Sequence, residues 1–168
     1  MGWFVRSIDW ISEHTGRLAA WLVVPLILTI VYSVVVRYWL GGVVHWAFEM
    51  SIFFYGVLVM LGGAFTLKHQ AHVRVDVLAQ YLGPRWRFGL DLASFVMVIA
   101  VCGLVVWIGT RSAWMSTLRL ERSPLQTPFD PQIWWFKWFI PLAAGLIALQ
   151  SLAEIVKAWR TLVKTSQE

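Results

Sequence analysis

Four histidines are the residues of this sequence best suited to hold a cofactor, because histidines on two helices of a membrane bundle can ligate a haem iron between them. His45 precedes the second apolar segment, whereas His69 and His72 follow it. A helix over that segment would separate the two groups by roughly 30 Å. His14 belongs to a segment expected at the membrane surface. We therefore predict interfacial histidines and no cofactor. The alternative is a haem or quinone redox subunit, which a Soret band would reveal.

Lys68, His72 and Asp76 are spaced four residues apart, so they share one face if the second apolar helix continues beyond the membrane. One interpretation is a stripe that faces water or lipid headgroups, with Asp76 capping the next short helix. The other is a polar contact with another subunit. Spacing alone favours the solvated stripe.

Arg37 and Glu49 bracket the first connection between apolar segments. A pair between them would hold the first two helices together. Without that pair, each charge is still tolerated at this position, because long side chains reach nearby water and headgroups.

The apolar segments themselves carry no Asp, Glu, Lys, Arg or His at their centres. Carriers that bind ions or charged substrates in mid-membrane usually have such a residue or a broken helix there. We therefore predict that the chain does not move a substrate alone; an autonomous small exporter is the alternative. Cys102 is the only cysteine, which excludes a disulfide framework or a cysteine metal cluster within the chain. No catalytic or metal-binding residue is predicted, and the chain is not expected to be an enzyme.

The composition points to a bilayer as the solvent, because 59% of the 168 residues are hydrophobic and the mean hydropathy is +0.67. A spanning helix needs about 20 apolar residues. Four segments meet that requirement, over about 18–38, 48–68, 90–111 and 134–156. Tryptophans such as Trp46 lie near their ends, as expected for rings that favour the headgroup layer. The prediction is an all-α membrane protein with four transmembrane helices in one integral membrane domain, 1–168.

Residues 2–14 form an amphipathic pattern, with apolar residues at helical spacing opposite Arg6, Asp9 and Glu13. This pattern predicts an N-terminal interfacial helix that lies along the membrane surface. Residues 73–82 predict a second short amphipathic helix. The third connection contains too many prolines for a continuous helix.

Lysine and arginine counts predict the orientation. Nine lie in the N-terminal segment, the second connection and the C-terminal tail, and five lie in the other two connections. The excess favours cytoplasmic termini. These charges stand between apolar blocks instead of forming a basic stripe with aromatic partners, so the sequence indicates contact with membrane lipid and no nucleic acid.

Small residues on the second span, Gly62 and Gly63 among them, allow another helix to approach closely. Spacing does not say whether that helix belongs to this chain or to another protein.

Several of these residues, in this order and spacing, resemble the small membrane subunit, DctQ type, of tripartite ATP-independent periplasmic (TRAP) transporters. The residues that carry the resemblance are Arg37-Tyr38, Trp46, Glu49, Leu61-Gly62-Gly63-Ala64, Lys68 and His72-Val-Arg-Val-Asp76, followed by the stretch from Pro128 to Leu142. Two departures occur in or near the first connection, where Gly41-Gly42 and Phe48-Glu49 replace the family's usual Asn and Pro and its paired acids.

The resemblance implies a non-catalytic subunit in a bacterial inner membrane. A large membrane subunit would carry the sodium and substrate sites, and a periplasmic binding protein would capture an organic acid. The small subunit would pack on the scaffold of the large one. The resemblance also favours intersubunit or interhelix contacts for Arg37, Glu49, His72 and Asp76. Arg119 and Arg122, in the third connection, are the candidates for docking the binding protein; the alternative is that this connection is an ordinary interfacial loop.

Overall fold

A computed structural model describes residues 2–69, 84–125 and 127–165. The helices run in the order α1 (Gly2–Trp21), α2 (Val23–Trp39), α3 (His45–Lys68), α5 (Pro84–Leu118), α6 (Trp134–Lys137) and α7 (Phe139–Thr165). The predicted short helix over 73–82, together with His72 and Asp76, lies outside the described residues.

Four helical segments of the described chain are long and apolar enough to cross a membrane. They are Val5–Trp39, His45–Lys68, Leu92–Leu118 and Trp134–Lys157. Outside the helices, the described residues form turns and irregular connections, with one isolated bridge between Arg122 and Gln132. The predicted all-α fold with four transmembrane helices is confirmed.

The first two helices form one long rod that bends at Leu22. Pro25 has no N–H to donate to the carbonyl one turn earlier, so the regular hydrogen-bond ladder is interrupted there. The Leu22 N–H instead bonds the Ala19 carbonyl in a tighter turn, at 2.9 Å. Residues 2–14 are thus the first part of α1, and Val5 and Ile8 pack against Ala153 of α7. The predicted position of this segment along the membrane surface stays a prediction.

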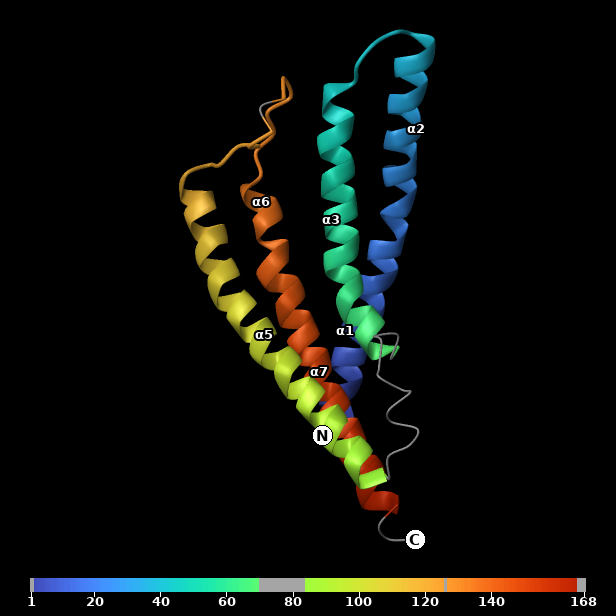
Figure 1. Cartoon of the computed structure of the whole chain (residues 1–168), viewed down its shortest axis with the longest axis vertical. Helices are drawn as coiled ribbons and strands as arrows, with labels where there is room; N and C mark the ends of the chain where they lie inside the picture. Colours follow the sequence, from blue (N-terminus) through green and yellow to red (C-terminus); the bar gives the residue numbers. More distant parts are fainter. Residues whose placement is uncertain (1, 70–83, 126, 166–168) are drawn as a thin grey trace.

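Figure 1 shows two groups of helices, which converge toward the end that holds both termini. One group is α2 with α3, and the other is α5 with α6 and α7. Small residues allow the close approaches between helices. A Cβ added at Gly56 would lie 2.5 Å from Cζ of Phe136, and one at Gly63 would lie 2.9 Å from Cδ1 of Ile147. Helix α3 is therefore the central element, with α1, α2 and α7 packed around it.

Candidate functional site

At the end of the bundle that holds the termini, a buried polar cluster joins α1 to α7. We call Asp9, Ser12, Gln150, Glu154 and Lys157 the terminal network. The Ser12 hydroxyl donates to Oε1 of Gln150 at 2.7 Å, and the Gln150 amide donates to Asp9 at 2.9 Å and to Glu154 at 3.1 Å. The Lys157 ammonium donates to both carboxylates, at 2.7 and 2.8 Å. Gln150 is fully buried and Glu154 is 5% exposed, so these bonds replace water that the groups have lost.

A second set of bonds joins α1 to α3 beside the terminal network. The Lys68 ammonium donates to the Glu13 carboxylate at 2.7 Å and to the Asp9 carbonyl at 3.1 Å. Arg17 pairs with Glu13 from the outside, at 3.0 Å, and His69 lies 3.7 Å from the same carboxylate. Lys68, one of the predicted contact residues, therefore makes an interhelix contact.

Sequence reasoning missed the terminal network because it placed the polar face of residues 2–14 toward water. One signal was present. Gln150, Glu154 and Lys157 recur at helical spacing at the end of the fourth span, and Asp9, Ser12 and Glu13 do so on α1. Two polar faces at the same membrane boundary can pack together.

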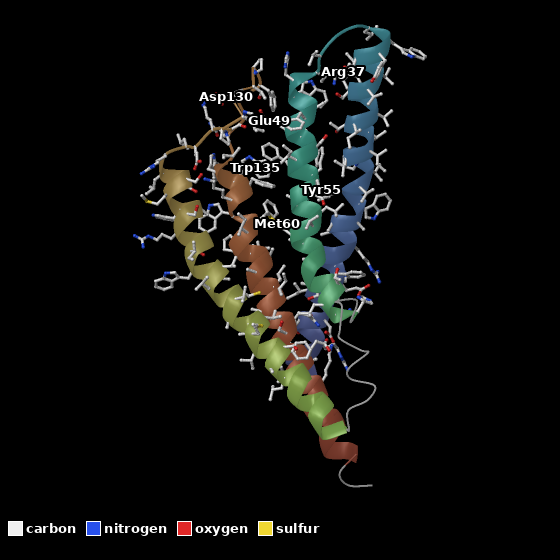
Figure 2. The ribbon with its side chains drawn as sticks, viewed as in Figure 1. Arg37, Glu49, Tyr55, Met60, Asp130 and Trp135 are labelled. Carbon is white, nitrogen blue, oxygen red and sulfur yellow. The ribbon has the colours of Figure 1, made fainter. Side chains whose placement is uncertain are left out.

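Glu49 occupies the opposite end of the bundle, between α3 and the connection that leads to α6, as Figure 2 shows. Its side chain is 1% exposed, and one carboxylate oxygen accepts a hydrogen bond from the Thr127 hydroxyl. The other oxygen, Oε2, has no hydrogen-bond partner among the residues that the structure describes. One turn further along α3, the Phe53 ring packs 5.2 Å from the rings of both Trp135 and Phe136. Glu49 therefore anchors the third connection on α3, above an aromatic layer.

Arg37 does not take part in this contact. It lies on α2, exposed, and its guanidinium has no ion pair or hydrogen bond to the described residues. The pair between Arg37 and Glu49 is thus not formed in the structure. Trp46 links α2 and α3 instead, because its ring stacks on Tyr32 with the centroids 5.8 Å apart.

The third connection is held by contacts within itself and by contacts with the helix ends. Arg122 pairs with Asp130 at 2.8 Å, and the Ser123 N–H bonds the Pro131 carbonyl at 2.9 Å. Lys137 pairs with Glu121 at 2.5 Å. The hydrogen bond from Lys137 is the main cause that lowers the pKa of Glu121 below its usual range.

This lowered pKa predicts a loss of stability in acid. A carboxylate whose pKa is lower in the folded state stabilises the fold above its unfolded value and loses that contribution as it protonates. We expect the stability of the third connection to fall as the pH drops below the ordinary glutamate value of 4.5. Hydrogen exchange of the connection's amides, measured from pH 6 to pH 3 after correction for intrinsic rates, checks this. Glu121→Gln should remove that part of the pH dependence; an unchanged profile would contradict the prediction.

The remaining predicted residues make few contacts with the described part of the chain. A Cβ at Gly62 would meet nothing within 4 Å, in contrast to Gly63. Arg119 is exposed close to Glu121. Among the histidines, His14 and His69 each bond a backbone carbonyl one turn earlier, at 2.9 and 3.1 Å. The described residues contain no group of three or more potential metal ligands.

Residues 26–161 match the family model described as "Tripartite ATP-independent periplasmic transporters, DctQ component". The chain belongs to this family. DctQ components are transporter subunits and not enzymes, which confirms the absence of catalysis predicted above.

One curated relative is the "C4-dicarboxylate TRAP transporter small permease protein DctQ" of Vibrio cholerae, 26% identical over 112 residues. The match covers 67% of this chain and 48% of the relative, so this DctQ component aligns with about half of the relative's length. The present chain is a multi-pass membrane subunit with four transmembrane helices.

Proposed function

We propose that this DctQ component is the part of a sodium-coupled organic-acid transporter that packs on the scaffold of the large membrane subunit and stabilises it. The observation that supports the proposal most directly is an uncovered apolar stripe on α3. Phe48, Ile52, Tyr55, Val59 and Gly62 recur every three or four residues, so they share one face of the helix.

The packed faces of α3 lie elsewhere. Phe53 and Gly56 contact Phe136, and Phe65 contacts Gly16 of α1. The four large side chains of the stripe are exposed, with Tyr55 at 61%. Gly62 leaves open space at one end of it, and a small residue on an apolar helix face lets a second membrane helix approach closely. A helix of the large subunit is the occupant that the family membership supports.

The charges support a division of labour between the subunits. At one end of the bundle, the terminal network and the Lys68 contact use their charged groups to hold helices together. This use supports sodium and substrate sites on the large subunit. The name of the Vibrio cholerae relative, a C4-dicarboxylate transporter subunit, supports a small organic acid as the substrate class.

The same proposal places the chain in a bacterial inner membrane with cytoplasmic termini, supported by the excess of lysine and arginine on that side. The third connection then faces the periplasm, where Arg119 is exposed for a binding protein. Arg122 is already paired with Asp130, so its expected role is to keep the connection in shape.

Gly62→Leu tests the proposed interface. A Cβ at this position would have no described residue within 4 Å, so we expect the variant to fold, while a helix of the large subunit is pushed away. Co-purification of the large subunit from native membranes should fall about tenfold, which corresponds to about 1.4 kcal/mol. Gly103→Leu on α5 is the matched control, because it also enters open space but lies off the stripe. Normal recovery of the large subunit with Gly62→Leu would refute the proposed interface.

A further inference from the structure

Helix α5 has one packed face and one uncovered face. Ala113 is fully buried, and Cys102 and Ser116 are nearly so. Gly109, on the same side, faces α7, because a Cβ there would lie 3.4 Å from Cδ of Pro141. This side of α5 is therefore occupied by the chain itself.

The opposite side carries a Trp-Arg-Trp stripe, Trp107, Arg111 and Trp114, flanked by Leu104 and Leu118. These residues recur every three or four positions and so share one face. All are exposed, Trp107 to 77% and Trp114 to 58%. An arginine thus lies between two tryptophans on an otherwise apolar surface.

Within the described residues, the Arg111 guanidinium has no counter-charge. The described acidic side chains bond elsewhere: Asp9, Glu13, Glu49, Glu121, Asp130 and Glu154. The guanidinium itself forms no hydrogen bond or ion pair. Since an anion stabilises a cation that lies next to an apolar surface, the stripe is suited to an anionic partner from outside the chain.

The depth of the stripe indicates which anion is available. Arg111 precedes the end of α5 by seven residues, or about 10 Å. Across the same end, Lys137 bonds Glu121 and Trp138 bonds Thr117. Lysine and tryptophan are the residue types expected at a membrane boundary. Tryptophans one turn on either side favour the headgroup layer. The long side chain of Arg111 can reach outward to that layer, where the phosphate of a glycerophospholipid lies.

We propose that the Trp-Arg-Trp stripe binds the phosphate of an anionic glycerophospholipid, in the leaflet that meets the α5–α6 connection. Arg111 donates hydrogen bonds to the phosphate oxygens, with the fork geometry that suits this group. Trp107 and Trp114 flank the headgroup and the upper acyl chain. This site is on the opposite side of α5 from α7 and does not depend on the proposed contact with the large subunit.

Native mass spectrometry of the full chain in mild detergent tests the site, by titration with dioleoyl phosphatidylglycerol and, separately, dioleoyl phosphatidylcholine. The wild type should bind phosphatidylglycerol more tightly. Arg111→Gln should weaken that binding about fivefold, and Trp107→Leu with Trp114→Leu should weaken it further. Arg119→Gln, which removes another exposed charge just beyond the end of α5, should change it less than twofold.

Circular dichroism shows whether each variant keeps its helices; since Arg111 is exposed, no loss is expected. Arg111→Lys keeps the charge and should retain the lipid preference. Equal wild-type affinity for the two lipids, or unchanged phosphatidylglycerol binding by Arg111→Gln, would overturn the proposal. Release of a co-purifying membrane protein by Arg111→Gln, with lipid binding unchanged, would also overturn it and assign the stripe to a protein interface.

Discussion

Lys157→Met is expected to lower the free energy of unfolding by about 2 kcal/mol, because it leaves two carboxylates without the cation that bonds them. Lys157 lies 2.7 Å from Asp9 and 2.8 Å from Glu154, and Glu154 is almost fully buried. Methionine fills a similar volume but supplies no donor. Unfolding by sodium dodecyl sulfate in mixed micelles, followed by circular dichroism, measures the change.

Arg17→Met is the matched control for this prediction. It also removes a cation from a pair with an acid, Glu13, but the Arg17 side chain is 70% exposed and Lys68 still neutralises that carboxylate. An exposed pair contributes at most about 1 kcal/mol. If the two variants lost equal stability, burial of the terminal network would not be the reason for its effect.

Gly16→Leu is expected to cost about 3 kcal/mol through overpacking. A Cβ at this position would lie 2.4 Å from Cγ of Phe65 and 2.5 Å from its Cβ. These atoms are close to the α3 backbone, so a rotamer change cannot clear them and α1 must move away. The same detergent titration measures the loss, and weaker protection of α1 in hydrogen exchange would locate it.

Gly62→Leu provides the comparison within the same fold. It places an equally large side chain in open space, and it replaces a glycine that is unfavourable in a helix by up to about 1 kcal/mol. The isolated chain should therefore be unchanged or slightly more stable. A large loss with Gly62→Leu, or none with Gly16→Leu, would contradict the packing described here.

These substitutions separate two roles of the helices, packing within the chain and contact with a partner or a lipid. Gly16 and Lys157 hold α1 against α3 and α7, so their replacement acts on the chain itself. Gly62 and Arg111 lie on uncovered faces, so their replacement is expected to act on a partner or a lipid while the chain stays folded. Comparing unfolding with partner and lipid binding in the same variants distinguishes the two.

The sequence by itself determined the fold class and the number of spans, because apolar length is a local property and lipid requires each helix to satisfy its own backbone. The bend near Pro25 follows in the same way from a missing N–H. The resemblance carried by Arg37, Glu49 and the Leu61–Ala64 run identified the family, which the family model then confirmed.

Only the tertiary structure decided which polar faces meet. Glu49 bonds Thr127, 78 residues away, and not Arg37; Asp9 bonds Lys157, 148 residues away. Helical spacing predicts which residues share a face. The neighbour that this face contacts depends on the angles at which the helices cross. For the same reason Gly62 and Gly63, adjacent in sequence, differ in what they contact: one turns to open space and the other to Ile147 of α7.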